Sequence, residues 1–411
     1  MRPSGTERLL TAHRSTENAA SPLHGSPAQR GGVFLLDPSK RCEPSAYLFT
    51  RAVTFFLANG YTLAGNIDES DIILVNSCCV TEDKIASSRA ALAFAAERAQ
   101  GKRLVLFGCM AGLPLTDLKQ EGLIRIGPGD LAELGRHFPH EVPVDRVAVH
   151  RLPPAFYEPG QGLGHQDYFV MIAQGCSNRC SYCNIRRVKG RVRSRPAEAI
   201  LAEIQAGIAL GAESFVLLAD DCGSYGHDRG TDLASLLEGL GAAGEGFRVK
   251  LGYLFPRFVL SHFDRLRKVF ETGRIAYVNI PVQSGSQRIL DLMNRRYAAG
   301  EVRDAVRRLQ AAAPQTRFCT HIMVNFPTES EGDFLESLAI ADAFETVLFL
   351  NYSDNRGTAA AGLFPKVGER EARRRLDMAS DYVNRRGRGS GAVISDFDCD
   401  LPYNLSREAR D

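Results

Sequence analysis

Apolar runs of strand length alternate with helical segments along most of this chain, and this alternation constrains the fold more than any other feature. A strand–helix–strand order gives a parallel sheet, because the crossover helix returns the chain to the same end of the sheet. We therefore predict an α/β domain over residues 32–150. Its expected strands are residues 33–36, 72–76 and 104–107, with helices at 44–59 and 84–100.

A second series of strands and helices follows a Pro- and Gly-rich stretch, residues 152–164, which is typical of a linker. Between its strands, segment 197–210 places Ile200, Ile204 and Ile208 on one helical face. Six βα units predict an open barrel of partial TIM type, with its active site at the carboxyl ends of the strands. The expected strands are 168–174, 214–220, 249–253, 276–282, 317–324 and 347–352.

The predicted architecture is α/β throughout: a flavodoxin-like βαβ domain at 32–150, then a partial (β/α)6 barrel at 165–360. Residues 361–411 are expected to form a C-terminal helix and a short tail. Residues 1–31 are rich in Ser, Ala, Gly, Pro and charge, without the apolar core of a secretory signal, so we expect a flexible leader.

The bulk composition is that of a globular protein, 44% hydrophobic and 24% charged. No run of eighteen apolar residues occurs, so no membrane span is expected and a cytoplasmic location is predicted. The net charge of +2 is too small to indicate a strongly nucleic-acid-binding surface. Ten cysteines in a reducing compartment favour metal binding or catalysis over disulfides.

Three of these cysteines, Cys176, Cys180 and Cys183, stand at C-x3-C-x2-C spacing directly after the first expected barrel strand. Three thiolates on one tight loop can hold three irons of a four-iron cluster and leave the fourth iron open. An open coordination site lets a metal bind and activate a substrate. Zinc is the alternative metal, although structural zinc sites use four ligands and no fourth Cys or His lies close by.

This loop, Gly175-Cys176-Ser177-Asn178-Arg179-Cys180-Ser181-Tyr182-Cys183, resembles the signature of the radical S-adenosylmethionine (SAM) superfamily. The resemblance implies that the open iron chelates SAM and that one-electron reduction yields a 5′-deoxyadenosyl radical. It also implies an electron donor such as flavodoxin or ferredoxin. The aromatic Tyr182 before Cys183 fits the same pattern.

Cys42, Cys78 and Cys109 each lie at or after the carboxyl end of a strand expected in the first domain, where α/β folds place ligands. Their surroundings, Asn76-Ser77-Cys78-Cys79-Val80 and Phe107-Gly108-Cys109-Met110, resemble the N-terminal domain of the methylthiotransferase family. The resemblance implies that these three cysteines bind a second four-iron cluster. At the first position the match is poorer, because Arg41 stands where the family usually has glycine.

The similarity to methylthiotransferases extends over roughly residues 32–385. The closest segments are 190–195, 218–226, 281–286, 293–295 and 352–359. Asp220 replaces the family's usual glutamine, and Asn325-Phe326-Pro327-Thr328-Glu329 lacks two glycines that the family usually carries. The resemblance implies cofactor-binding roles for Tyr182, Arg195, Glu203, Asp220, Gln283 and Ser284.

The expected reaction is sulfur insertion, with SAM and two four-iron clusters as cofactors, the second cluster presenting the sulfur. Only about 25 residues follow the last expected helix, too few for a nucleic-acid-binding β-barrel. The first hypothesis is therefore a small-molecule or nucleoside substrate of specialised metabolism such as antibiotic biosynthesis, with sulfur possibly replacing oxygen. The second is a tRNA methylthiotransferase that recognises RNA through the barrel. A third, an iron–sulfur carrier without turnover, leaves the SAM-type loop without a use.

The remaining cysteines, Cys79, Cys222, Cys319 and Cys399, have no cluster spacing and are interpreted as structural. His321 is expected to pack or to contact substrate, rather than to bind metal. The basic run 186–195 is either a solvated loop or a contact for phosphate or carboxylate groups. Residues 373–375 are expected on an exposed helix face.

Overall fold

The computed structural model describes residues 30–37, 42–114, 120–150, 167–387 and 391–394. These residues form two compact units; the first comprises residues 30–79 and 83–150, the second residues 80–82 and those from 167 onward. The predicted leader up to residue 29, the predicted linker and Cys399 lie outside the described residues. Among the described helices, none is both long and apolar enough to cross a membrane.

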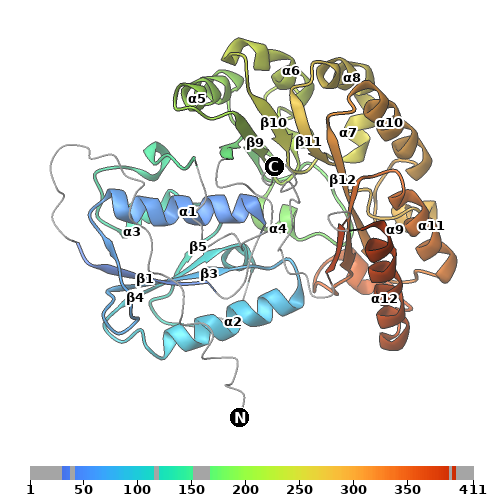
Figure 1. The fold of residues 1–411 in the computed structure, drawn as a ribbon. Helices are drawn as coiled ribbons and strands as arrows, with labels where there is room; N and C mark the ends of the chain where they lie inside the picture. The colour runs from blue at the N-terminus through green and yellow to red at the C-terminus, as the bar shows by residue number, and fades with distance from the viewer. Residues whose placement is uncertain (1–29, 38–41, 115–119, 151–166, 388–390, 395–411) are drawn as a thin grey trace. The chain divides into compact units, whose positions relative to one another are not determined.

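The first unit is a five-stranded parallel sheet in the order β2-β1-β3-β4-β5. Figure 1 shows α1 on one face of this sheet and α2 on the other, so the predicted α/β class is confirmed. The strands are β1 (Gly32–Leu36), β2 (Thr62–Leu63), β3 (Ile72–Ser77), β4 (Arg103–Gly108) and β5 (Ile124–Ile126). The helices are α1 (Glu43–Ala58), α2 (Glu82–Ala96) and α3 (Glu133–His137).

Burial explains why β3 is the central strand of the first unit. Every residue of β3 is buried, as a strand covered on both faces by helices requires. On one face, Phe49 of α1 packs against Phe107 of β4 with ring centroids 5.8 Å apart. Helix α1 begins directly after Cys42 and carries Pro44 in its first turn, where the missing N–H costs no hydrogen bond.

The second unit is a seven-stranded parallel sheet in the order β14-β13-β12-β11-β10-β9-β6. Figure 1 shows its strands along an arc with α5, α6, α8, α10 and α11 on the outer side, which is the arrangement of an open barrel. The strands are β6 (Tyr168–Met171), β9 (Ser214–Leu218), β10 (Arg248–Leu251), β11 (Ile275–Asn279), β12 (Arg317–Val324), β13 (Thr346–Asn351) and β14 (Gly391–Ile394).

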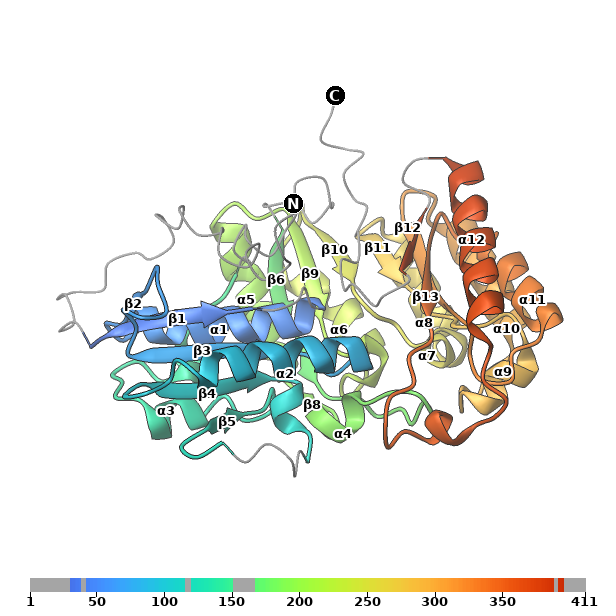
Figure 2. The same cartoon turned by 90° about the horizontal axis from the view of Figure 1, so that it is seen from below.

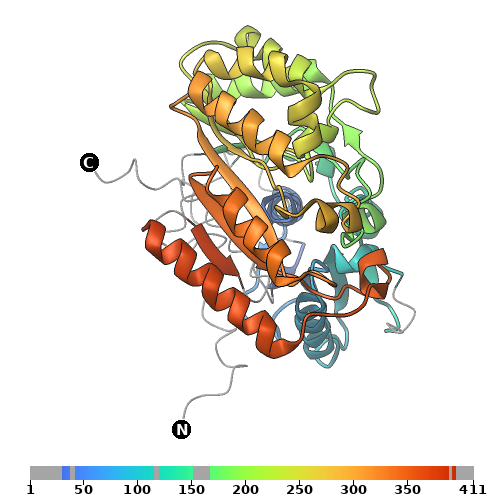
Figure 3. The same ribbon diagram turned by 90° about the vertical axis from the view of Figure 1, so that its right-hand side faces the viewer.

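Helices and one small hairpin complete the second unit, and the views in Figures 2 and 3 show the helical layer from other sides. The hairpin is antiparallel and pairs β7 (Ala173–Gln174) with β8 (Arg193–Ser194). The helices are α4 (Ile185–Lys189), α5 (Ala197–Ala209), α6 (Leu233–Glu238), α7 (Pro256–Ser261), α8 (Phe263–Glu271), α9 (Gln287–Leu292), α10 (Ala299–Ala312), α11 (Glu331–Ala341) and α12 (Glu369–Arg386).

Strand β14 was not expected from the sequence, which predicts only a polar tail after α12. It pairs parallel to β13, with Val347 opposite Gly391. A Cβ at position 391 would lie 2.0 Å from the Val347 carbonyl oxygen, so the pairing needs glycine there. Tertiary pairing with the free edge of β13 therefore makes a strand out of a segment with little intrinsic strand signal.

The core of the second unit lies between the sheet and the helices around it. Ile200 and Ile204 of α5 are fully buried there, as their predicted helical spacing implies, and Ile208 packs at the margin. Phe270 of α8 stacks on Phe318 of β12 with ring centroids 5.7 Å apart. Apolar contact along one stripe of each helix thus holds the helical layer on the sheet.

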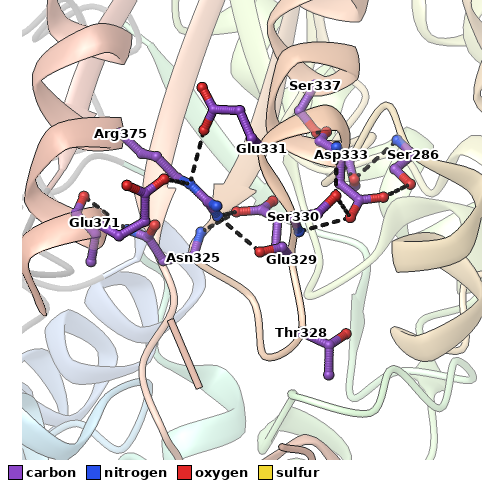
Figure 4. A network of polar contacts seen from close by, with 12 residues as sticks. Ser286, Asn325, Thr328, Glu329, Ser330, Glu331, Asp333, Ser337, Glu371 and Arg375 are labelled. Carbon is purple, nitrogen blue, oxygen red and sulfur yellow. Dashed lines mark hydrogen bonds and ion pairs between the residues drawn. The ribbon is translucent and has the colours of Figure 1, made fainter. Parts of the chain in front are cut away.

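A buried ion pair joins α12 to the loop after β12 (Figure 4). Arg375 Nη1 lies 3.0 Å from Glu329 Oε2, and the two side chains are 4% and 0% exposed. Glu329 Oε2 also accepts a hydrogen bond from the Asn325 backbone N–H at 2.7 Å. The prediction of an exposed face is therefore wrong for Arg375, although Arg373 is exposed as expected. Two positions along an α-helix turn the side-chain direction by about 200°, so Arg375 points inward where Arg373 points to solvent.

The same network leaves one carboxylate oxygen, Glu329 Oε1, buried without a hydrogen-bond partner among the described residues. Burial raises the pKa of the Glu329 carboxyl from its ordinary value of 4.5 to about 7, against the opposing influence of Arg375. A raised carboxyl pKa means that the folded state holds a proton that the unfolded chain has already released.

We therefore predict that the free energy of unfolding falls as the pH rises from about 4.5 through about 7, by about 1–3 kcal/mol from this group. Denaturant unfolding at several pH values should show that Glu329→Gln removes this part of the slope. Glu369→Gln removes a carboxylate whose side chain is 90% exposed and outside this network, and it serves as the control. A Glu329→Gln variant with the wild-type slope would contradict the assignment.

Candidate iron–sulfur and SAM site

Cys176, Cys180 and Cys183 lie on one loop after β7, at the carboxyl end of β6 and its continuation. Gly175 turns the chain into this loop with φ of +78°, and a Cβ there would lie 2.4 Å from the Arg191 carbonyl oxygen. Only glycine satisfies both the backbone conformation and this close approach. The sequence thus sets the start of the loop at a single residue.

Each sulfur atom of the loop accepts a hydrogen bond from nitrogen. Cys176 Sγ accepts from the Asn178 backbone N–H and from Asn178 Nδ2, both at 3.4 Å. Cys183 Sγ accepts from the Ile185 N–H at 3.4 Å, and Cys180 Sγ from Arg295 Nη1 at 3.5 Å. Donors aimed at sulfur stabilise thiolates and tune cluster potentials, so this environment fits an iron–sulfur cluster.

Without metal, burial keeps two of these thiols protonated. Burial raises the pKa of Cys183 to about 12 and that of Cys176 further, with smaller contributions from neighbouring groups. Cysteine ligands bind metal as thiolates, so metal loading of this loop releases protons. Within the described residues no three His, Cys, Asp or Glu side chains stand at metal-binding distance of one another. The fit of the loop to a cluster therefore rests on its donor set.

Asp221, which the sequence analysis did not single out, fixes the position of the loop from the carboxyl end of β9. Its carboxylate accepts four hydrogen bonds, from Asn178 Nδ2 at 2.7 Å, Ser224 Oγ at 2.6 Å, Gly223 N at 2.9 Å and Phe255 N at 3.1 Å. Ser224 Oγ in turn accepts from the Ser177 N–H at 3.1 Å. Loop residues 177 and 178 are thereby held by the β9 loop.

Arg295, in the turn after α9, contacts both the cysteine loop and the segment after β10. Besides Cys180, its guanidinium donates to Tyr182 Oη at 3.1 Å and Tyr297 Oη at 2.6 Å, and it lies over the Phe255 ring at 4.4 Å. Arg295 is only 3% exposed. The predicted cofactor residue Tyr182 is therefore part of a buried group around Cys180.

The other predicted cofactor residues are held by partners within the protein. Arg195 pairs with Glu203 at 2.6 Å, and Asp220 pairs with Lys189 at 2.6 Å while accepting from the Gly175 N–H at 2.9 Å. Ser284 is fully buried and its hydroxyl lies 3.1 Å from Ser337 Oγ of α11. These contacts support the loops of the site, and cofactor binding by these residues stays a prediction.

Gln283 stands out among the predicted residues because its side-chain oxygen, Oε1, is buried without a partner. Its backbone has φ of +72° and bridges to β12 by donating to the His321 carbonyl at 2.8 Å. Asn279, Asn325 and Asn355 have buried Oδ1 atoms that likewise lack a partner within the described part of the chain. All four residues follow or end strands of the sheet, so unsatisfied acceptors gather in the carboxyl-edge loops.

In the first unit, one hydroxyl lies between two of the predicted cluster cysteines. Ser45 Oγ of α1 lies 3.3 Å from Cys42 Sγ and 3.5 Å from Cys109 Sγ. Cys78 follows β3, and its N–H donates to Ser88 Oγ at 3.0 Å. Cys42 and Cys109 thus lie near each other, as convergence at one sheet edge predicts, while Cys78 stays anchored to α2.

Among the cysteines interpreted as structural, Cys79 is buried in the first unit, and Cys222 and Cys319 are buried in the second. Cys222 and Cys319 are both inaccessible to solvent. Burial lowers the pKa of His321 to about 3, so its ring is neutral, and Nε2 lies 2.8 Å from Asn279 Nδ2. In the basic run, Arg186 donates to the Ser177 carbonyl at 3.1 Å, and Arg187 donates to the Arg356 carbonyl at 2.9 Å. Arg186 is half-buried and Arg187 is exposed, so these two arginines support loops at the surface of the unit.

Comparison with known proteins places the chain in its family. Residues 170–341 match the Radical SAM superfamily, and residues 42–125 match the Uncharacterized protein family UPF0004. The tRNA-2-methylthio-N(6)-dimethylallyladenosine synthase of Pelotomaculum thermopropionicum is 32% identical, over 79% of this chain and 76% of its own length. The ribosomal protein uS12 methylthiotransferase RimO of Acidithiobacillus ferrooxidans is 31% identical, over 84% of this chain and 81% of its own length.

Solved structures with the same fold share little sequence with this chain. The radical SAM methyltransferase TsrM from Kitasatospora setae aligns with a TM-score of 0.51 at 14% identity, covering 77% of this chain and 72% of TsrM. The cobalamin-dependent SAM radical enzyme OxsB aligns with a TM-score of 0.52 at 12% identity, covering 86% of this chain and 56% of OxsB. The fold is that of radical SAM enzymes, and with the relatives above the chain belongs to the radical SAM methylthiotransferase family and is an enzyme of that type.

Proposed function

We propose that this enzyme attaches a methylthio group to an adenosine of tRNA, with SAM and two four-iron clusters as cofactors. The observation that carries the proposal is the loop of Cys176, Cys180 and Cys183, in which every sulfur accepts a hydrogen bond from nitrogen. No fourth Cys or His lies close to this loop in the sequence. Three ligands leave one iron of a four-iron cluster open.

SAM bound at such an open iron supplies a primary carbon radical after one-electron reduction, and a second cluster supplies the sulfur. The chain's own residues prepare this site. Asn178 and Arg295 donate to the ligand sulfurs, which stabilises them as thiolates. The buried acceptor oxygens of Gln283 and Asn325 are suited to amino or hydroxyl groups of a bound ligand, because each otherwise stays unsatisfied.

For the second cluster we propose Cys42, Cys78 and Cys109 as the ligands. The proximity of Cys42 and Cys109 to the shared Ser45 hydroxyl supports this assignment. Cys78, in the loop after β3, would be the third ligand. Its backbone N–H is held by the Ser88 hydroxyl, so its side chain would have to turn toward the other two cysteines. The match to UPF0004 begins at Cys42 and includes all three cysteines.

The names of the relatives favour a tRNA substrate over the small-molecule substrate expected first from the sequence. Several relatives are named as tRNA methylthiotransferases acting on dimethylallyladenosine or threonylcarbamoyladenosine. Others, at similar identity, are named as ribosomal protein uS12 methylthiotransferases. Ribosomal protein uS12 is therefore the second candidate substrate. Both activities attach a methylthio group. They differ in the group that enters the site, which is an adenosine of tRNA in one case and a side chain of a protein in the other.

The iron content tests the ligand assignments. Anaerobic reconstitution is expected to give about eight irons per chain, and Ala at Cys176, Cys180 and Cys183 together should leave about four. Electron paramagnetic resonance of the reduced triple variant should show only one type of cluster. Cys222→Ala and Cys319→Ala are control variants, which should keep all the iron because both residues are packed in the core. A triple variant with full iron would refute the loop as a cluster site.

The substrate class is tested with defined substrates and mass spectrometry. Enzyme with SAM, reductant and tRNA carrying N6-modified adenosine should yield nucleosides heavier by the replacement of hydrogen with a methylthio group. Parallel reactions with unmodified tRNA and with ribosomal protein uS12 distinguish the two candidates. Modification of uS12 alone would transfer the assignment to the ribosomal protein, and modification of neither would reopen the small-molecule hypothesis.

A triple variant with Cys42, Cys78 and Cys109 each replaced by Ala tests whether the first unit delivers sulfur or only stabilises the fold. If its cluster delivers sulfur, the triple variant should still cleave SAM to 5′-deoxyadenosine, while methylthio product should fall at least about 100-fold. Circular dichroism and thermal unfolding establish whether the variant folds. Ser88→Ala, which removes the contact to the Cys78 N–H, is a milder variant that should lower product more than SAM cleavage. Wild-type product formation by the triple variant would eliminate a role in sulfur delivery.

A further inference from the structure

A cationic pocket lies against the outer part of the cysteine loop. It has a volume of about 270 Å³ and is open to solvent. Its walls come from three segments of the second unit: the cysteine loop, the start of α7 and the turn after α9. The lining residues are Ser177, Asn178, Arg179, Phe255, Arg257, Asn294 and Arg296.

The pocket concentrates positive charge that the chain as a whole lacks. Arg179, Arg257 and Arg296 are exposed, and none forms an ion pair with another described residue. The pocket has no Asp or Glu in its lining, whereas the whole chain carries a net charge of only +2. Arg296 Nε donates to the neutral Asn294 Oδ1 at 3.3 Å, so its charge is not neutralised. Three guanidinium groups without a carboxylate partner around one opening attract an anionic partner and accelerate its encounter.

Residues in the walls of the pocket form hydrogen bonds with the cysteine loop. Asn178, which lines the pocket, donates to Cys176 Sγ with both its backbone and its side-chain nitrogen. Asn294 donates from Nδ2 to the Arg179 carbonyl at 2.7 Å, and its backbone has φ of +56°, a conformation that asparagine tolerates better than most residues. The Ser181 N–H donates to the Met293 carbonyl at 3.0 Å. A partner that contacts Asn178 in the pocket is therefore separated from the Cys176 sulfur by this one residue.

We propose that this pocket, with Arg179, Arg257 and Arg296 as its rim, is the docking surface for an acidic one-electron carrier protein. The proposal rests on the proposed function, because it needs the cluster held by Cys176, Cys180 and Cys183. The carrier, with a reduced flavin or iron–sulfur centre, loses one electron, and the oxidised cluster gains it. No proton or covalent bond is exchanged in this step.

An electron carrier fits this position better than the phosphates of an RNA substrate. Electron transfer slows steeply with distance, so a carrier has to dock close to a cluster ligand, and the pocket reaches Asn178. A substrate base has to reach the buried acceptors of the carboxyl-edge loops, such as Gln283 and Asn325, and neither residue lines this pocket. Arginine provides both charge and directional hydrogen bonds to carboxylates of such a partner.

The double variant Arg257→Glu/Arg296→Glu tests the surface and leaves the cysteine loop unchanged. Its matched control, Arg370→Glu/Arg385→Glu, changes the net charge equally at exposed positions of α12. Figure 1 shows α12 and α7 in different parts of the second unit. Binding of a bacterial flavodoxin is measured by calorimetry at several salt concentrations, and SAM cleavage is measured with either reduced flavodoxin or dithionite.

We expect the double variant to bind flavodoxin at least about tenfold more weakly at low salt, with a smaller salt dependence than wild type. Flavodoxin-driven SAM cleavage should fall by a similar factor, whereas dithionite-driven cleavage should stay within about twofold of wild type. The control variant should behave as wild type in both assays. Unchanged flavodoxin binding in the double variant overturns the proposal.

Two further outcomes also decide against it. An equal loss of cleavage with dithionite and with flavodoxin would mean that the arginines support the SAM site. Loss of tRNA association with normal flavodoxin binding would make the pocket an RNA contact. Failure of the cluster assignment, the part of the proposed function on which this proposal rests, is distinguishable, because wild-type enzyme would then cleave no SAM with dithionite. The calorimetry would still test whether the carrier docks here.

Discussion

Parallel strand pairing is the constraint on which both units depend. In a parallel sheet all strands end at the same edge, so residues far apart in sequence meet there without direct local signals. In the second unit this edge gathers the cysteine loop, Asp221 after β9, Gln283 after β11 and Asn325 after β12. In the first unit the same rule brings Cys109 after β4 near Cys42 before α1. The candidate sites follow from sheet topology before any side-chain chemistry is considered.

Within this framework, hydrogen bonding decides what the cysteine loop can do. A thiolate buried without donors is costly, because burial favours the neutral thiol, as the raised pKa of Cys183 shows. Donors from Asn178, Ile185 and Arg295 reduce this cost at the three sulfurs. Asp221 follows β9, whereas Arg295 lies in the turn after α9, so the cysteine loop keeps its shape only while the barrel is folded.

The edge of the sheet also contains backbone strain. Gln283, Asn325 and Thr328 have φ values of +72°, +64° and +68°, although none is glycine, and such conformations cost about 1 kcal/mol or more each. The surroundings compensate for the strain: the Asn325 amide donates to Asn351 Oδ1 at 2.8 Å, and the Thr328 N–H donates to the Pro365 carbonyl at 2.8 Å. The ion pair of Glu329 and Arg375 closes the same loop against α12 (Figure 4).

The sequence by itself determined the α/β class, the cysteine loop and most strand positions, because hydrophobic periodicity and cysteine spacing are local properties of the chain. Tertiary structure decided the rest. Arg375 was expected at the surface, but its burial depends on a carboxylate 46 residues away. Strand β14 exists because β13 offers a free edge, and Asp221 and Arg295 gain their roles only through contacts with the cysteine loop. These features arise from pairing between distant segments, which no local pattern encodes.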